Sequence, residues 1–413
     1  MSTLAAIRGF KDILPDQSRL WRLMEDKARD LALRFGYAEL SPPIMEKTEL
    51  FQRGIGEVTD IVEKEMYTME DRSGEKITLR PEATAGLVRA VLEHNLCEGA
   101  RPAKLFCFGP MFRYERPQKG RLRQFHQFDV EVFGDVGPYI DAEIILLLHT
   151  LLSELGINDL QVVVNSLGCP SCRPAFREKL TSFLSERQSS LCPDCRRRLE
   201  HNPLRILDCK NEQCRSEVMI GPKMDQFLCL SCKDHFQLLT TVLTQVNLNF
   251  RIDPLLVRGL DYYTRTTFEV HSGQLGAQSA VAGGGRYDGL CSKLGGADIP
   301  GLGFAVGLER LFMLLSQADS PKESGPDYYV AVLCPEALGP AFELVQNLRA
   351  RGLKVEADWE SGGLKSRLKR ADKASAQRVI MLGPDEMAGG QATIRDLSTK
   401  QQWNLPLDQP QRY

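Results

Sequence analysis

A chain of 413 residues is longer than one hydrophobic core usually supports, so two or three domains are expected. The composition, 43% hydrophobic and 26% charged, is that of a globular protein, and the net charge of −2 excludes a strongly basic nucleic-acid binder while allowing a local basic face. The longest apolar run, residues 144–148, is too short to cross a membrane, and the first residues carry no apolar signal core. Twelve cysteines without such a signal indicate reduced or metal-bound thiols in a cytoplasmic protein.

The first part of the chain predicts a helix, an extended segment and a long β-hairpin. Apolar residues at helical spacing predict an amphipathic helix over residues 16–35. Ser-Pro-Pro at 41–43 forbids a helix there. Strand signals on both sides of a polar loop predict a hairpin over residues 104–133. A helix over residues 143–155 and a further strand should follow.

The remainder predicts an insertion, a return of the main sheet and a small separate domain. The chain becomes rich in cysteine and basic residues after Cys169, and strands return with TRTTFEV. Composition marks residues 316–327 as a linker to an α/β domain. The predicted parts are a main domain in two pieces (1–164 and 250–320), a Cys-rich insertion (165–249) and a C-terminal domain (328–413).

Two short segments place polar side chains on one face of a predicted strand. Period-two alternation puts Gln127, Asp129 and Glu131 opposite an apolar face, and Arg113 lies on the partner strand of the hairpin. Carboxylates that face arginines indicate a site for a charged small molecule, although a solvated strand face would give the same pattern. A similar pattern predicts a second polar strand face, formed by Thr78, Arg80, Glu82 and Thr84. An exposed edge strand is the alternative explanation of this pattern.

The hairpin loop carries five cations against one acid, Glu115. They are Arg113, Arg116, Lys119, Arg121 and Arg123. Such a loop is usually a solvated tip, but arginine forks above a strand also suit a polyphosphate. Phe125 could stack on a purine base or belong to the core.

Three further segments combine polar groups with glycines. RGLDYYTRTTFEV crowds Arg258, Asp261, Tyr262, Tyr263 and Arg265 into eight positions, which favours a pocket wall over a core strand. AGGGRYDGL predicts a glycine turn. GLGFAVGLERLF predicts a strand that enters a helix, from whose first turn Arg310 can reach back over the strand ends.

In this order, the segments resemble one family. FRYERPQKGRLRQF is similar to motif 2 of class II aminoacyl-tRNA synthetases and GLGFAVGLERL to motif 3, while RGLDYYTRTTFEV and GGGRYDGL resemble the two signatures of the histidyl-tRNA synthetase family. The resemblance covers nearly the whole chain. It implies an α+β fold: a mostly antiparallel mixed sheet flanked by helices, with a Cys-rich insertion and a C-terminal α/β anticodon-binding domain.

The resemblance implies an ATP-dependent ligase of the cytoplasm. Such an enzyme activates L-histidine to histidyl-adenylate with release of pyrophosphate, uses Mg²⁺ with ATP, and passes histidine to the 3′ end of tRNA(His). The segment 41–43 resembles motif 1, which lies in a homodimer interface in this family. The alternative is the histidine-binding regulatory subunit of ATP phosphoribosyltransferase, which would lack the C-terminal domain. A catalytically dead RNA-binding or histidine-sensing module is a further alternative, against which Arg113, Arg258 and Arg310 argue.

The resemblance also implies a role for individual residues. Arg113 and Arg258 would be the catalytic cations. Histidine would be bound by Glu82, Ala83, Thr84, Arg113, Gln127, Glu131, Arg258, Tyr262 and Tyr263, with Glu131 and Tyr263 on the two imidazole nitrogens. ATP would be bound by Arg113, Glu115, Arg121, Phe125 and Arg310. Candidates for tRNA contact are Arg116 and Gln118 in the motif 2 loop, and Lys365, Arg367, Lys369 and Arg370 on a C-terminal helix that could equally be a solvated face.

Eight cysteines form four close pairs in the insertion. The pairs are Cys169/Cys172, Cys192/Cys195, Cys209/Cys214 and Cys229/Cys232. Together they could supply one or two tetrahedral structural Zn²⁺ sites. The family's chemistry requires no zinc and its insertion can fold without cysteines, so a set of buried thiols is the alternative.

Overall fold

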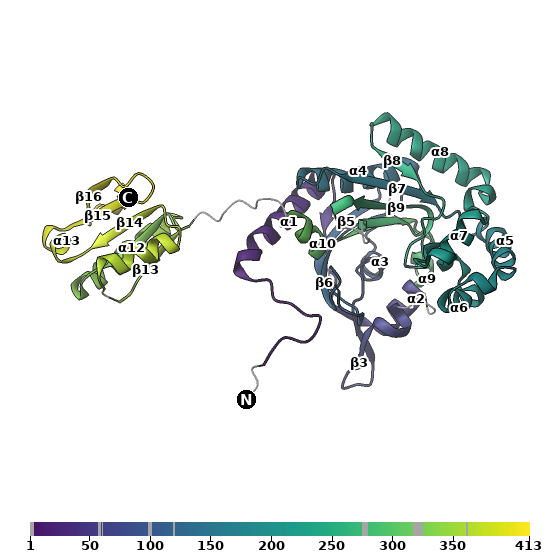
Figure 1. The fold of residues 1–413 in the computed structure, drawn as a ribbon, viewed down its shortest axis with the longest axis horizontal. Coiled ribbons are helices and arrows are strands. Elements are labelled where there is room, and N and C mark those ends of the chain that lie inside the picture. Colours follow the sequence, from purple (N-terminus) through teal and green to yellow (C-terminus); the bar gives the residue numbers. More distant parts are fainter. Residues whose placement is uncertain are drawn as a thin grey trace. The chain divides into compact units, whose positions relative to one another are not determined.

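The computed structural model describes residues 4–56, 59, 61–97, 101–118, 120–274, 280–316, 325–360 and 362–413. The chain divides into two units, Met1–Ser320 and Pro321–Tyr413 (Figure 1). Most of the linker predicted at 316–327 lies outside the described residues.

An eight-stranded sheet organises the first unit. Its order is β1-β5-β6-β11-β10-β9-β7-β8, and its pairs are antiparallel except for β1 with β5 and β7 with β8. The predicted mostly antiparallel mixed sheet is therefore confirmed. The strands are β1 Ala38–Glu39, β5 Ala103–Phe112, β6 Gln124–Phe133, β7 Leu160–Ser166, β8 Phe250–Ile252, β9 Thr264–Ser272, β10 Ala280–Arg286 and β11 Gly301–Gly307.

Four helices cover one face of this sheet and bury the largest apolar cluster of the unit. They are α1 Pro15–Arg34, α4 Pro138–Glu154, α8 Leu230–Gln245 and α10 Leu308–Leu315. The prediction of α1 is confirmed within one residue at each end. The predicted start of α4 at residue 143 is wrong, because Pro138 occupies the first turn, where its missing N–H costs nothing.

The opposite face packs against shorter helices and a small sheet. The helices are α2 Thr48–Ile55, α3 Thr84–Glu93 and α9 Leu290–Lys293, and the π-helical turn η1 Ile61–Glu65 lies between α2 and α3 in the chain. The small sheet has the order β2-β4-β3, with β2 Met45–Lys47, β3 Tyr67–Glu70 and β4 Lys76–Leu79.

The predicted strand face over residues 78–84 is wrong. Strand β4 ends at Leu79, and the Thr78 hydroxyl contacts Thr48 and Thr68 at 2.8 and 2.9 Å. Arg80 turns away and donates to the Pro110 and Pro42 carbonyl oxygens, both at 2.9 Å. Only Glu82 and Thr84, at the start of α3, therefore reach the open face of the large sheet.

The Cys-rich segment is helical and has an apolar cluster of its own. It contains α5 Arg173–Ser185, η2 Gln188–Ser190, α6 Pro193–His201, η3 Pro203–Asp208, α7 Glu212–Ile220 and η4 Met224–Phe227. Helix α8 packs differently, because its buried residues Leu239 and Leu243 belong to the cluster of the large sheet. Residues 230–249, expected inside the insertion, thus lie largely with the main sheet.

The second unit is built on a five-stranded sheet of order β13-β12-β14-β15-β16. Helix α11 packs in one of its two apolar clusters and α12 in the other, as an α/β domain requires. The elements are β12 Tyr328–Val332, η6 Pro335–Ala337, α11 Leu338–Ala350, β13 Val355–Ala357, α12 Leu364–Lys373, β14 Arg378–Leu382, α13 Pro384–Gly389, β15 Gln391–Asp396, β16 Gln402–Pro406 and η7 Pro410–Arg412.

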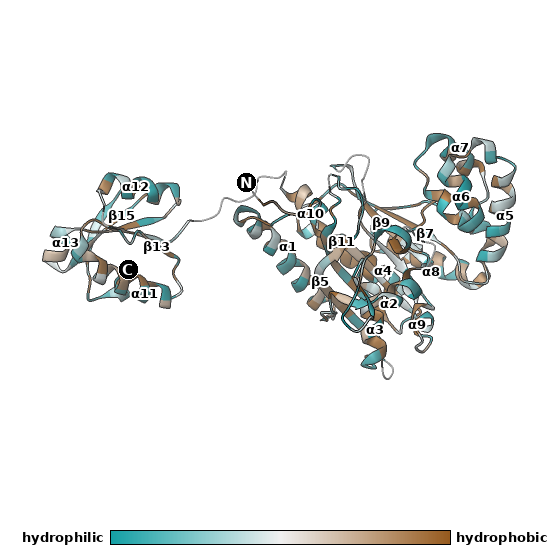
Figure 2. Cartoon of the chain, turned by 90° about the horizontal axis from the view of Figure 1, so that it is seen from below, coloured by the Kyte–Doolittle hydropathy of each residue, from teal (hydrophilic) through white to brown (hydrophobic). Residues whose placement is uncertain are grey.

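Hydropathy follows this layering. In Figure 2 strand β5 is largely brown, while helices α1 and α6 carry teal segments. Among the described residues, no helix combines the length and the apolar character that crossing a bilayer requires.

Candidate active site

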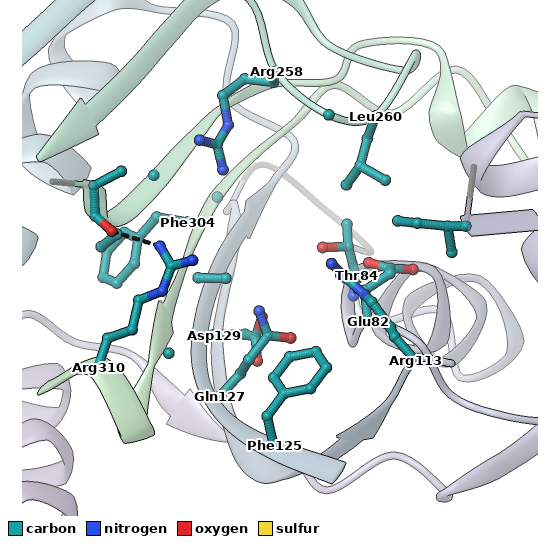
Figure 3. Close-up of a pocket in the computed structure, with 18 of the residues that line it drawn as sticks. Glu82, Thr84, Arg113, Phe125, Gln127, Asp129, Arg258, Leu260, Phe304 and Arg310 are labelled. Carbon is teal, nitrogen blue, oxygen red and sulfur yellow. Dashed lines mark hydrogen bonds between the residues drawn. The ribbon is translucent and has the colours of Figure 1, made fainter. Parts of the chain in front are cut away.

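A cavity of about 300 Å³ lies on the open face of the large sheet. In Figure 3, Arg258 and Arg310 lie on one side of it, Glu82, Thr84 and Arg113 on the other, and Gln127 and Phe125 between them. The sequence-predicted residues that line it are Glu82, Thr84, Arg113, Glu115, Arg121, Phe125, Gln127, Glu131, Arg258, Tyr262, Tyr263 and Arg310. Ala83 instead packs in an apolar cluster beside the cavity.

Strand β6 supplies the floor of the cavity. The predicted alternation is confirmed: Gln127 and Asp129 line the cavity, whereas Phe128 and Val130 lie in the apolar cluster behind the sheet. The strand pairs with β5 on one side and β11 on the other, which fixes the direction of every side chain along it.

Glu131 is buried and held by two hydroxyl groups. Thr84 Oγ1 donates to one carboxylate oxygen at 2.7 Å, and the Tyr287 hydroxyl donates to the other at 2.5 Å. Burial raises the pKa of Glu131 well above its usual value, while these two hydrogen bonds lower it. A side chain on Gly303, the residue opposite on β11, would overlap the Glu131 carboxylate, so glycine is required there.

Two more carboxyl groups lie beside Glu131. Glu82 accepts from the backbone N–H groups of Thr84 at 2.8 Å and Ala85 at 3.0 Å, at the start of helix α3. Burial, and next the charge of Glu82, raise the pKa of Asp129 to about 8. Three buried carboxyl groups at one end of a cavity suit a ligand that carries a cationic group.

Arginines also line the cavity. Arg113 donates from Nε to the Pro81 carbonyl at 2.8 Å and lies 5.2 Å from the centre of the Phe125 ring. Arg121 pairs with Glu115 at 3.2 Å. Arg310 reaches back from the first turn of α10, as predicted, and donates to the Ala280 carbonyl at 2.7 Å.

Arg258 is partly buried beside strands β9 and β10. Its guanidinium forms an ion pair with Glu269, and this carboxylate also contacts His271 at 2.9 Å. A side chain on Gly283 would collide with the guanidinium, so a glycine of the AGGG run makes room for this arginine. Burial would lower the pKa of Arg258, but the nearby Tyr263 and Glu269 raise it, so the cation is retained.

Two buried atoms of the lining have no protein partner within the described parts of the chain. They are Gln127 Oε1, an acceptor, and Arg258 Nε, a donor. A buried polar atom without a partner costs free energy unless water or a ligand satisfies it. The cavity therefore offers an unused acceptor and an unused donor to a ligand that has both cationic and anionic groups.

Sequence reasoning gave no individual role to three residues of this site: Asp129, Glu269 and Tyr287. The alternation of β6 did place Asp129 on the polar face that was predicted to bind a charged small molecule. Tyr287 lies in GGGRYDGL and Glu269 in TRTTFEV, so the signatures contained both residues. Their contacts depend on how β6, β9 and β10 are joined, which no local pattern determines.

The remaining candidates lie outside the cavity lining. Arg116 and Gln118 are exposed in the hairpin loop, and Lys119 lies outside the described residues. On helix α12, Lys365, Lys369 and Arg370 are exposed. Arg367 differs, because it is buried and pairs with Asp358 at 2.8 Å. This arginine therefore does not share the exposed basic face.

The eight paired cysteines gather in two groups of four in the Cys-rich segment. The first Cys group consists of Cys169, Cys172, Cys229 and Cys232, and the second Cys group of Cys192, Cys195, Cys209 and Cys214. Neither group lines the cavity. Both groups could hold a metal ion, at sites separate from the cavity.

Comparison with known proteins identifies the family. The family model described as Histidyl-tRNA synthetase matches residues 9–172 and 224–311, and that described as Anticodon binding domain matches residues 327–410. The histidine–tRNA ligase of Desulfosudis oleivorans is 52% identical over 405 residues, which cover 98% of this chain and 96% of the relative. The histidine–tRNA ligase of Trichlorobacter lovleyi is 48% identical over 98% of this chain and 96% of its own length.

The same family emerges from the comparison of folds. The crystal structure of apo S. aureus histidyl-tRNA synthetase superposes with a TM-score of 0.82 at 31% identity, over 98% of both chains. The first family match leaves out residues 173–223, which form most of the helical Cys-rich segment. With its large, mostly antiparallel sheet, its arginine-lined cavity and its C-terminal α/β unit, this chain belongs to the histidyl-tRNA synthetase family.

Proposed function

We propose that the chain is a histidine–tRNA ligase. It activates L-histidine with ATP to histidyl-adenylate and pyrophosphate, and then transfers histidine to the 3′ end of tRNA(His). The observation that carries this proposal is a single cavity with buried carboxyl groups at one end and Arg258 and Arg310 at the other.

The acidic end suits the amino acid. A neutral imidazole offers one donor and one acceptor, so the Glu131 carboxylate takes the N–H while the Tyr263 hydroxyl serves the other nitrogen. Gln127 Oε1, which has no partner among the described residues, accepts from the α-ammonium group. Glu82, Thr84 and Tyr262 complete the wall around the ligand. An isostere without these polar groups would leave the partners unpaired and bind far more weakly.

The cationic end suits the triphosphate. The histidine carboxylate is itself the nucleophile, so no general base is needed, and it attacks the α-phosphate in line with the departing pyrophosphate. Arg113 and Arg258 stabilise the charge that develops on the phosphoryl oxygens. Arg121 and Arg310 bind the β- and γ-phosphates, and Phe125 stacks on adenine.

The site also fits the Mg²⁺ that the family implies. Glu115 places a carboxylate beside Arg121 in the lining, and carboxylate with phosphate oxygens is the ligand set that Mg²⁺ prefers. When bound there, the ion would neutralise charge on the pyrophosphate side.

Other parts of the chain would serve the tRNA and a second subunit. Arg116 and Gln118 contact the acceptor end, and Lys365, Lys369 and Arg370 offer an exposed phosphate-binding surface on α12. A homodimer would cover Ile44, Met45 and Met69, which are exposed by 44%, 40% and 42%. Twelve free thiols suit the cytoplasm.

A histidine-binding regulatory subunit is the second candidate. A protein from Bacillus halodurans C that is titled as such a subunit or a histidyl-tRNA synthetase shares the fold, with a TM-score of 0.65 at 22% identity. A regulatory subunit does not account for a cavity lined with phosphate-binding arginines.

Amino-acid-dependent ATP–pyrophosphate exchange tests the proposal. Exchange should occur with histidine and stay at background with each of the other nineteen amino acids. A protein that binds histidine but exchanges no pyrophosphate would contradict the ligase proposal and favour the regulatory subunit.

The imidazole contact can be tested separately with Glu131→Gln. Glutamine keeps the size but removes the charge, and losing a charged hydrogen bond costs roughly 1.5–3 kcal/mol, or about ten- to 150-fold. We expect the histidine KM in pyrophosphate exchange to rise by this factor, with the ATP KM little changed. Glu178→Gln, at an exposed position of α5, serves as the control. An unchanged histidine KM would mean that Glu131 does not face the ring.

A further inference from the structure

The chain brings its four cysteine pairs together in a nested order. Pair Cys169/Cys172 meets pair Cys229/Cys232, and the two middle pairs meet each other. In each group the four sulfur atoms all lie within 4.8 Å of one another. The spacing of the cysteines along the sequence is compatible with one metal site or two, and with other combinations of the cysteine pairs. The fold brings the pairs together as two separate groups.

The sulfur spacing matches a tetrahedral metal site. Four thiolates at the usual Zn–S length of about 2.3 Å would lie roughly 3.8 Å from one another. Cys169 Sγ lies 3.5 Å from Cys172 Sγ and 4.0 Å from Cys229 Sγ, and in the second Cys group Cys192 Sγ lies 3.9 Å from Cys209 Sγ. A disulfide would need about 2.05 Å, and all twelve cysteines are free.

The backbone around both groups favours anionic sulfur. Cys172, Cys192 and Cys229 are the N-cap residues of α5, α6 and α8, so the positive ends of three helices point toward the groups. The backbone N–H of Cys229 donates to Cys172 Sγ at 3.2 Å, and that of Cys192 donates to Cys214 Sγ at 3.1 Å. Such N–H groups stabilise thiolates and orient them as ligands.

We propose that each Cys group binds one Zn²⁺, so that the chain carries two structural zinc ions. Each group supplies all four ligands, which leaves no open position for water or substrate, as in structural rather than catalytic zinc sites. The ions hold the helical segment together: the first Cys group joins the starts of α5 and α8, and the second joins α6, η3 and α7.

The size of the segment explains the need for the ions. The apolar cluster of the Cys-rich segment has sixteen buried residues, five of them cysteines: Cys172, Cys195, Cys209, Cys214 and Cys232. A core this small rarely supports a stable fold unaided, and metal sites are a common remedy. Zinc bound by thiolates places cross-links at the centre of that cluster.

The two sites also position part of the active-site cavity. Asn202, between α6 and η3, donates to Asp261 at 2.9 Å, and Arg205 in η3 donates to the Arg258 carbonyl at 2.8 Å. The second Cys group fixes the elements that carry Asn202 and Arg205. Beside the first group, the Arg265 N–H donates to the Gly168 carbonyl at 2.9 Å. Zinc bound at the two sites therefore stabilises the backbone of residues 258–265, through contacts that lie outside the cavity.

Metal content tests the proposal directly. Protein purified without a metal-affinity column should contain about two zinc ions per chain, and eight of the twelve thiols should react only after chelation. Exchange of zinc for Co²⁺ should give thiolate-to-cobalt charge-transfer bands with the intensity of two tetrahedral sites. Protein without metal, protein with iron, or protein with one zinc per chain would each overturn the proposal.

Cysteine-to-serine variants test which Cys group binds each zinc ion. Cys229→Ser should lower the zinc content to about one per chain, and Cys192→Ser should do the same at the other group. Both cysteines are at least partly exposed, so the substitutions disturb packing little. Cys97→Ser, at a partly exposed cysteine outside both groups, should retain two ions. If Cys229→Ser and Cys192→Ser both kept two ions, the assigned ligands would be wrong.

Chelation supplies a readout of the structural role. Zinc removal should lower the melting temperature and open α5 to α7 to hydrogen exchange, while pyrophosphate exchange with histidine falls but is not abolished. Unchanged melting and exchange after complete zinc removal would overturn the structural role.

Discussion

Replacing Arg258 with alanine should lower histidine-dependent pyrophosphate exchange by on the order of 10²–10³-fold, while folding and ATP binding remain largely intact. Negative charge builds on the α-phosphate in the transition state more than in either substrate, so a cation aimed there contributes to rate rather than to uniform binding. Transfer from preformed adenylate should suffer less. Steady-state exchange and single-turnover transfer separate the two steps.

The ion pair between Arg258 and Glu269 provides the control for this experiment. Arg258→Ala alone leaves the half-buried Glu269 without its cation, which could disturb the site for a structural reason. In the double variant Arg258→Ala/Glu269→Gln, a structural loss should be recovered, whereas a catalytic loss should persist. Arg258→Lys should restore activity only in part, because a point charge lacks the guanidinium fork. Near wild-type exchange by Arg258→Ala would show that this arginine is not catalytic.

Removal of the second unit, from Tyr328 onward, should separate activation from tRNA charging. Every residue that lines the cavity lies in the first unit, so histidine activation should stay within a few-fold of the full chain. Charging should fall by about two orders of magnitude or more at subsaturating tRNA, since losing roughly 3 kcal/mol of binding lowers affinity more than a hundredfold. Pyrophosphate exchange and aminoacylation on the same preparation give the two numbers.

A milder variant refines the same prediction. Lys365→Ala/Lys369→Ala removes two exposed cations of α12 and should weaken tRNA binding and reduce its salt dependence, without affecting activation. Arg367→Ala is unsuitable for this purpose, because it would remove the buried ion-pair partner of Asp358 and disturb the fold of the unit. Equal loss of activation and charging in a folded truncation would contradict an RNA-binding role for the second unit.

Sequence patterns correctly predicted those secondary-structure elements that depend on residues close together in the chain. The amphipathic spacing of α1, the β5–β6 hairpin and the passage from β11 into α10 are all confirmed, because each depends on residues close in sequence. Sequence patterns that extend from one secondary-structure element into the next predicted the structure less well. The polar positions from 78 to 84 resembled one strand face, yet the strand ends at Leu79 and the next residues turn into α3.

The sequence by itself determined the family, because its motif segments have the residue types and the order along the chain that are typical of one kind of site. It also determined that Gln127 and Glu131 share a face, since side chains alternate along any strand. Only the tertiary structure decided that Tyr287 contacts Glu131, that Arg258 pairs with Glu269, and that the cysteine pairs meet in a nested order. Each of these contacts joins residues brought together by strand order or by packing between helices, and neither is encoded in the spacing of one segment.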